Sequence, residues 1–510
     1  MIRRTHRRPA ALLCGLMAVS LLSSACGLKA EQRDALKQAG GAAVQGGGAA
    51  GTGGLTDPSL GGTTGGVAAG TSGGTTGGLA AGTSGGTGGG TFTTSGGTTG
   101  GSAGTTGGGT TGGTATGGAA PGVKRAPCSP PSGGDSTGIT SSSITIGIHA
   151  PQTGTGAPLP PSFKDGVAVY WKNHKVCGRT VNIDFQDDKY TPQTARQVCG
   201  PMARRDFFII GAAGTDQIQS CATMPEIAGK GVPYLSAGVT TNGLTGLNHY
   251  FATTLTYSQQ GPLVVRNAEM RGFDKPAPAR DGKQWAIVTS RTDNFADATA
   301  SIEQALKAKG ISYTTYRVDP SDDGLQQRAA QTGTTLATQG YGTVFVDTSP
   351  GYFIYMSGAA SKQGFNGMYT GPGVTMTEVT VAQLVCGPNP TIKANFLAPF
   401  PGIDRASDEF KQATGGKYDD IYWSLWGLSQ AIEQALNNAS DNFTRENFIA
   451  KMKTASLPGG VYPPVKYGGD SFGQHFGGTG AYSQTINCTK TEPNQSQPGA
   501  WDTVGGLINK

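Results

Sequence analysis

The residues with the clearest capacity for chemistry are the eight cysteines and five histidines of the 510-residue chain. A zinc site would need cysteines two residues apart or histidines at a ligating spacing, and the sequence has neither. A hydrolase nucleophile is typical of Gly-x-Ser-x-Gly between a strand and a helix, and here Gly-Thr-Ser-Gly-Gly occurs only in a glycine-rich tract. There is also no phosphate-binding or dinucleotide-binding loop. We therefore expect no metal, no cofactor and no catalytic residue, and predict that the chain is not an enzyme.

Two neighbouring carboxylates, Asp187 and Asp188, have the appearance of paired catalytic acids. They lie at the end of an expected strand and shortly before Pro192, which is a favoured first residue of a helix. Carboxylates at such a position accept backbone N–H groups and interact favourably with the helix dipole. The favoured interpretation is therefore structural.

The first 25 residues have the order of a signal peptide. Four arginines (Arg3, Arg4, Arg7 and Arg8) precede an apolar run over residues 10–22, which is too short to span a bilayer comfortably. Small residues then lead to Cys26, and this segment resembles the lipobox of bacterial lipoproteins, in which the cysteine carries the lipid. Ser23 stands where that motif prefers leucine, so cleavage by an ordinary signal peptidase and a free Cys26 thiol remain alternatives. We expect an extracytoplasmic protein that is lipid-anchored at the bacterial cell surface.

Loss of the signal peptide also lowers the formal net charge from +6 to about +2. So small a charge gives no support to nucleic-acid binding.

An exported chain with an even number of cysteines is typical of disulfide bonding. Cys199 and Cys221 are expected to form one bridge, since they fall at the end of one predicted helix and the start of the next. The other pairings are left open. The six cysteines beyond the leader are Cys128, Cys177, Cys199, Cys221, Cys386 and Cys488.

Residues 26–138 are expected to form a disordered linker, because Gly, Thr, Ser and Ala dominate them and cannot build a core. A glycine-rich chain of about 80 residues would reach on the order of 50 Å. That length suits a tether through a cell wall, and a product of sequence slippage with no selected length is the alternative.

From residue 141 onward, short β-branched runs alternate with amphipathic stretches, which indicates βαβ units on parallel sheets. The number of strands exceeds one compact sheet and favours an α/β fold of two Rossmann-like lobes joined by a hinge. Strands are expected at 144–148, 181–185, 207–211, 233–235, 285–290, 313–318, 344–348, 367–370 and 396–400. Helices are expected at 162–174, 192–203, 217–228, 258–271, 295–309, 324–339, 351–363 and 420–438, with Trp423, Leu425 and Trp426 packing in the core.

The segment Ser143–Gly154 resembles the first strand and loop of the branched-chain amino-acid-binding protein family, which has the type I periplasmic-binding fold. Similar landmarks follow at the family's spacing: Phe185–Asp188, Ile209–Gly211, Gly231–Ser236 and Gln259–Gly261. The resemblance covers residues 141–475. It implies a first lobe over 139–257 that returns over 398–455, a second lobe over 258–397, and a C-terminal segment over 456–510 that joins the second lobe and the hinge.

In such a fold the ligand is expected at the carboxyl ends of the strands, where helix N-termini offer free N–H groups. The resemblance implies that Thr215 and Thr240 bind a ligand carboxylate and that Phe295 covers the ligand, although packing at a helix start is an equal alternative for Phe295. The loop 371–373 lacks the family's acidic residue, which counts against a plain amino acid unless Asp293 or Asp347 replaces it. The candidate ligand-binding residues are Thr153, Gly214, Thr215, Gly238, Val239, Thr240, Asn294, Phe295, Thr348, Ser349 and Gly373.

These expectations describe a monomeric solute-binding protein that delivers a small polar ligand, such as an amino acid or an amide, to an ABC permease in the membrane. The permease is implied by the resemblance alone. A surface sensor that binds ligand without transport is the main alternative, and an exported hydrolase on the same scaffold is the third.

Overall fold

The computed structural model describes residues 127–153, 162–189, 191–320, 324–373, 376–468 and 475–510. The expected signal peptide, Cys26 and nearly all of the glycine-rich linker lie outside the described residues. Within the described part of the chain, no helix combines the length and apolar character needed to cross a membrane.

The first lobe is built on a six-stranded sheet with the order β2-β3-β1-β4-β5-β6. All neighbours pair in parallel except β2, which is antiparallel to β3. In parallel strands a helix normally connects each strand to the next, so the carboxyl ends gather at one edge. The strands are β1 (Ser143–Ala150), β2 (Lys175–Val176), β3 (Arg179–Asp187), β4 (Ile209–Gly211), β5 (Tyr234–Ser236) and β6 (Tyr250–Ala252).

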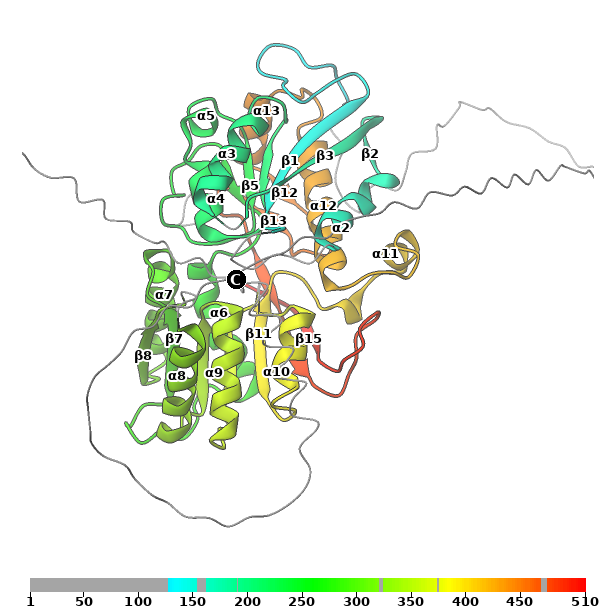
Figure 1. Cartoon of the computed structure of the whole chain (residues 1–510). Coiled ribbons are helices and arrows are strands. Elements are labelled where there is room, and N and C mark those ends of the chain that lie inside the picture. The colour runs from blue at the N-terminus through cyan, green and yellow to red at the C-terminus, as the bar shows by residue number, and fades with distance from the viewer. Residues whose placement is uncertain (1–126, 154–161, 190, 321–323, 374–375, 469–474) are drawn as a thin grey trace, which may run out of the picture. The chain divides into compact units, whose positions relative to one another are not determined.

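The second lobe contains a seven-stranded sheet with the order β15-β14-β11-β10-β9-β7-β8, drawn in green to red in Figure 1. The five strands from β11 to β8 are parallel, and β14 and β15 add an antiparallel edge. A separate small sheet pairs β12 (Ser456–Leu457) with β13 (Val465–Lys466). The strands are β7 (Trp285–Ser290), β8 (Tyr313–Val318), β9 (Thr343–Asp347), β10 (Met368–Pro372), β11 (Lys393–Ala398), β14 (Gly480–Asn487) and β15 (Ala500–Asn509).

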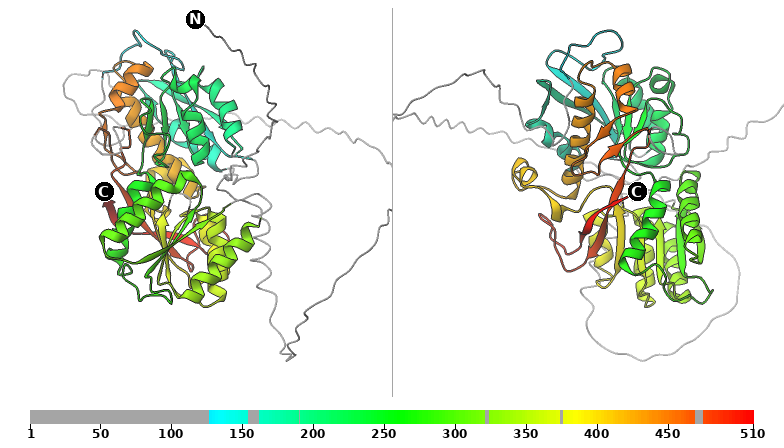
Figure 2. Two further views of the ribbon diagram at one scale, coloured as in Figure 1. Left: turned by 90° about the vertical axis from the view of Figure 1, so that its left-hand side faces the viewer. Right: turned by 180° about the vertical axis from the view of Figure 1, so that it is seen from behind.

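Helices cover both faces of each sheet, as Figures 1 and 2 show. In the first lobe these are α2 (Ser162–Val169), α3 (Pro192–Met202), α4 (Thr215–Ala222), α5 (Pro225–Ala228), α12 (Asp420–Asn438) and α13 (Arg445–Met452). In the second lobe they are α6 (Tyr257–Arg271), α7 (Ala296–Ala308), α8 (Leu325–Gln339), α9 (Pro350–Lys362) and α10 (Val379–Cys386). Short helices are α11 (Asp408–Ala413), η2 (Tyr170–Lys172), η3 (Asp293–Phe295) and η4 (Ile403–Arg405).

Alternation along the strands divides the buried apolar residues between the two faces. On β7, Trp285 and Ile287 join the core under α6 and α7, whereas Ala286 and Val288 join the core under α8, α9 and α10. Both faces of the strand are therefore buried, which explains its continuous apolar sequence. Trp423, Leu425 and Trp426 lie in the core of the first lobe, as expected.

The α/β two-lobed architecture confirms the expected fold class, and two local expectations are wrong. The helix predicted over 217–228 is broken into α4 and α5, because Pro225 disfavours helical geometry in the residue before it. Cys221 consequently lies near the end of α4 and not at the start of a helix. The antiparallel strands β14 and β15 were not predicted at all.

The chain passes from one sheet to the other near Ala252, Ala398 and Gly478. The first and third of these segments touch, since Ala252 forms a parallel bridge with Phe476. A Cβ atom on Gly478 would overlap the backbone of Thr254 and Leu255. Glycine is therefore required for this close approach.

Three disulfides join the six cysteines in the described part of the chain: Cys128–Cys177, Cys199–Cys221 and Cys386–Cys488. The second is the bridge that the sequence predicts.

Candidate functional site

A cavity of about 160 Å³ lies between the two lobes, at the carboxyl ends of five strands. The residues that follow β4 and β5 line it from the first lobe, and those that follow β9, β10 and β11 line it from the second. The long helix α12 closes one side through Asp420, Ser424 and Leu428. A space for one water needs about 10–15 Å³, so this cavity accommodates roughly ten non-hydrogen atoms.

Aromatic rings form much of the cavity wall. Tyr257 and Phe295 are stacked, with ring centroids 5.6 Å apart and an interplanar angle of 14°. Phe400 and Tyr462 form a second stacked pair at 5.9 Å and 18°. Phe163 adds a further ring from α2. Several sides of the cavity therefore present apolar, aromatic surface.

Asp347 lines the cavity from the end of β9 and is only 5% exposed. Its Oδ2 atom has no hydrogen-bond partner among the described residues. Burial, together with repulsion from the Asp297 carboxylate, raises the pKa of Asp347 to about 8. The neighbouring Thr348 is equally buried, and its hydroxyl also has no partner in the described part of the chain.

Asp420 lines the cavity from the first turn of α12 and is 7% exposed. Its Oδ2 atom accepts the backbone N–H of Val379 at 2.7 Å, and its Oδ1 atom has no partner among the residues that the structure describes. Burial and the nearby carboxylates of Glu492 and Asp419 raise the pKa of Asp420 well above its usual range. The cavity thus contains two buried carboxyl groups with unsatisfied oxygens.

Hydrogen bonds join the lobes beside the cavity. The backbone N–H and the hydroxyl of Thr241 in the first lobe donate to Asp297 Oδ2 on α7 at 2.7 and 2.8 Å. Asn294 on η3 donates through its side-chain amide to Asp216 on α4. A more open hollow of about 470 Å³ lies beside this second contact, with Arg196 and Asn294 among its lining residues. Its lining residues also follow strand ends, those of β3, β4 and β7, but they include no aromatic ring and neither Asp347 nor Asp420.

Five of the sequence-predicted binding residues line the cavity: Gly214, Thr215, Val239, Phe295 and Thr348. Gly214 adopts a φ of +87° immediately before α4, which a residue with a side chain rarely adopts. Thr215 then begins the helix, and its hydroxyl is 3.5 Å from the Tyr257 hydroxyl. Phe295 packs at the start of α7 and also lines the cavity, so its covering a ligand stays a prediction.

The other predicted residues make different contacts and are not among those that line the cavity. The Thr240 hydroxyl accepts the Asn242 N–H at 3.0 Å, and the Ser349 hydroxyl accepts the Tyr352 N–H as the cap of α9. Gly373 donates its N–H to Leu397 O. Gly238 donates its N–H to the Thr254 hydroxyl at 2.8 Å.

The region of Asp187 and Asp188 differs from the expectation of helix capping. Thr191 caps α3, while Asp187 accepts the N–H groups of Gln152, Thr153 and Lys189 and the Thr153 hydroxyl. Thr153 is therefore bound to the strand end and not to the cavity. Acids that precede a helix can either cap that helix or bind a neighbouring loop. Only the path of the chain after β1, which brings Gln152 and Thr153 to Asp187, distinguishes the two uses.

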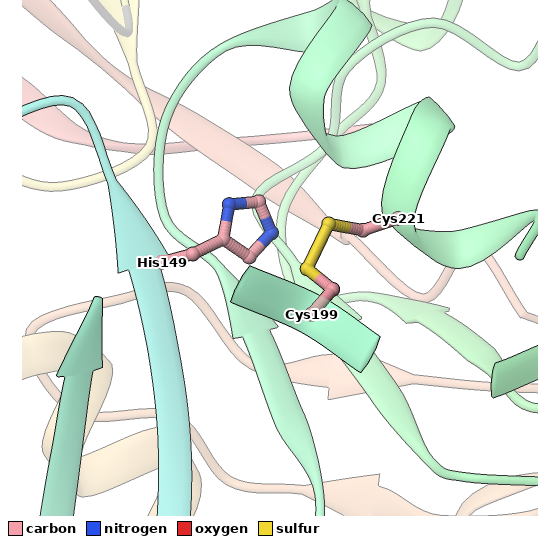
Figure 3. A group of neighbouring side chains, drawn as sticks. All are labelled: His149, Cys199 and Cys221. Carbon is pink, nitrogen blue, oxygen red and sulfur yellow. A yellow bond between two sulfur atoms is a disulfide. The ribbon is translucent and has the colours of Figure 1, made fainter. Parts of the chain in front are cut away.

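Asp188 instead forms a buried network on the other face of the first sheet. Its Oδ2 atom is 2.8 Å from His149 Nδ1, and His149 Nε2 is 2.5 Å from the Tyr234 hydroxyl. Figure 3 shows the His149 ring beside the Cys199–Cys221 bridge. Because the two sulfur atoms are bonded to each other, neither is a thiolate, and this group is not a metal centre.

Sequence reasoning missed Asp420, Phe400 and Tyr462 as cavity residues and assigned Leu425 to the core alone. Asp420 is the first residue of a long amphipathic helix, a position where an acid normally serves the helix dipole. The helical spacing gave a signal, because Asp420 precedes Trp423 by three residues and therefore shares the buried side of α12 with it.

The comparisons with known proteins agree with the fold. The model of the family described as periplasmic binding protein matches residues 143–487. A fatty acid ABC transporter substrate-binding protein from Thermomonospora curvata is 18% identical, with a TM-score of 0.59 over 74% of this chain and 95% of that one. A leucine-binding protein from Thermotoga maritima is 14% identical, with a TM-score of 0.55 over 72% of this chain and 99% of that one.

A solute-binding protein of an ABC transporter from Rhodopseudomonas palustris, in complex with 3,4-dihydroxybenzoic acid, is 16% identical. Its TM-score is 0.55 over 72% of this chain and 97% of that one. At these identities the likeness establishes the shared fold. A comparison with the curated proteins finds no match.

Proposed function

The chain belongs to the periplasmic binding protein family, and we propose that it captures a small polar solute outside the cytoplasm and delivers it to an ABC importer. The observation that carries this proposal is the cavity between the lobes, at the carboxyl ends of parallel strands from both. Binding there contacts both lobes at once, so a ligand stabilises the closed arrangement over an open one.

The ligand in this proposal is an amino acid, an amide or a compound of similar size. A cavity of about 160 Å³ suits a molecule of the size of leucine or a hydroxybenzoate. Gly214, Thr215, Val239, Phe295 and Thr348 are proposed to contact it. Lipid attachment at Cys26 would hold the protein at the membrane beside its permease.

The test is native mass spectrometry of the purified, unrefolded chain, followed by thermal-shift screening against small amino acids, amides, amines and carboxylates. We expect a mass increment of one small molecule, or a compound that raises the melting temperature. A chain that retains nothing and responds to no compound would contradict solute capture.

A further inference from the structure

The cavity has an unusual distribution of charge. Its lining residues include three acids, Asp347, Glu378 and Asp420, and no lysine, arginine or histidine among those that the structure describes. Asp347 and Asp420 are more than nine-tenths buried, and each has an oxygen without a hydrogen-bond partner in the described part of the chain. A buried carboxylate without compensation is costly, so each of these groups either holds a proton or is paired with a donor or a positive charge from outside the chain.

Three of the helix N-termini at the cavity do not favour an anion either. An N-terminus attracts a carboxylate through its free N–H groups and its partial positive charge. Among the ends at the cavity, those of α6 and α9 have no acid in the first turn, whereas three others already carry acids of the chain itself: Asp216 in the first turn of α4, Asp297 in that of α7 and Glu378 as the residue before α10. Asp420 also accepts an N–H of α10. The positive ends of these three helices are thus already compensated.

The aromatic rings of the cavity also favour a positive charge. The pairs Tyr257–Phe295 and Phe400–Tyr462 lie in the same cavity wall as the two buried acids. The face of an aromatic ring attracts a cation, and sites for organic ammonium groups combine several rings with few or no basic residues. An anion in the same place would meet ring faces, which repel it, and two acids that would have to stay protonated beside it.

Building on the proposed solute-binding function, we propose that the ligand is a small organic cation: a compact apolar or aromatic body of roughly ten non-hydrogen atoms that carries an amine or ammonium group. The positive group lies against Asp347 and Asp420, and the body packs between the aromatic pairs. This assignment differs from the aromatic carboxylic acid, 3,4-dihydroxybenzoic acid, that is in complex with the Rhodopseudomonas palustris protein.

The test uses matched sets of three compounds built on benzyl, isobutyl and cyclohexyl groups, each as the amine, the neutral amide and the carboxylate. Binding to the purified chain is measured by titration calorimetry at pH 7.5. We expect at least one amine to bind ten or more times tighter than its matched amide and carboxylate. The variants Asp347→Asn and Asp420→Asn should each lower amine affinity at least tenfold.

Asp408→Asn is the matched control, because Asp408 is fully exposed on α11 and should leave all affinities unchanged. Circular dichroism of each variant verifies folding. Because Asp347→Asn and Asp420→Asn change different elements, a loss of amine affinity in both is not explained by misfolding of one. Tighter binding of an amide or carboxylate would overturn the cation assignment and leave solute capture standing. Binding of no compound in any set would overturn the assignment and count against capture as well.

Discussion

At the scale of single residues, Asp347 is a group that the fold holds in an unfavourable state. The unfolded carboxyl titrates at about pH 3.9, whereas burial and Asp297 raise its folded pKa to about 8. Between these values the folded chain binds more protons than the unfolded chain, so the free energy of unfolding falls as the pH rises. Such a cost is typical of a group kept for binding and not for stability.

We therefore predict that Asp347→Asn flattens the dependence of the ligand-free melting temperature on pH between 5 and 8. Thr289, beside Asp347 on β7, is uncharged, so Asp297 is the principal charged neighbour. Each kcal/mol by which the variant lowers the cost of burying the ionised Asp347 carboxylate should raise the melting temperature at pH 8 by about 2–4 °C. Asp206 and Glu492, whose pKa values burial raises to about 7, titrate in both proteins and cancel in the difference. Parallel melting curves, measured by scanning calorimetry, would contradict the prediction.

At the scale of elements, the segments that connect the lobes are packed closely enough to need glycine. We predict that Gly478→Ala lowers the free energy of unfolding by about 1–3 kcal/mol, because the new Cβ atom overlaps the backbone of Leu255. Gly506→Ala on β15 is the control, since its Cβ would meet no atom within 4 Å. Urea denaturation of both variants measures the difference in the free energy of unfolding. Equal values would show that the segments at Gly478 and Leu255 can move apart without loss of stability.

The disulfides offer a second prediction about elements. Cys386–Cys488 closes a separation of 102 residues and joins α10 to the end of β14, whereas Cys199–Cys221 closes only 22. In the chain-entropy model a longer closed loop restricts the unfolded chain more, so replacing Cys386 and Cys488 by alanine should cost about 1 kcal/mol more than the same change at Cys199 and Cys221. A larger loss for the shorter bridge, measured by urea denaturation, would assign the effect to packing of the sulfur atoms.

At the scale of the whole molecule, the contacts between lobes favour a closed arrangement. Thr241 and Asp297 form two hydrogen bonds across the cleft, and these can exist only when α7 approaches the loop after β5. A ligand that contacts both lobes adds to them and shifts the population toward closure.

We predict that spin labels on Thr245→Cys in the first lobe and Ala308→Cys on α7 move closer together when ligand is added. Both positions are exposed, and the native cysteines in the described residues are disulfide-bonded. Double electron–electron resonance with the tightest-binding compound measures the separation, and a non-binding compound of the same set is the control. An unchanged distance distribution at saturation would exclude closure by a hinge.

The sequence by itself determined the class of fold, the family to which the chain belongs and most of the helices and strands. Runs such as Trp285–Ser290 and Tyr313–Val318 are strands with the predicted bounds, because strand alternation and local composition are properties of neighbouring residues. The strand-to-helix loops at Gly214–Thr215 and at Thr348 could likewise be predicted to border the cavity, since parallel strands end at one edge.

Tertiary structure decided the character of the site. Asp420 is more than 70 residues from Asp347 along the chain, and Phe400 and Tyr462 come from segments that sequence patterns associate with connections or core. Whether an acid is solvated, caps a helix or is buried without a partner depends on what the rest of the chain places around it. Asp188, Asp347 and Asp420 each lie at the end of a strand or the start of a helix, and only packing gives the first a histidine partner and leaves the other two facing an apolar, aromatic cavity.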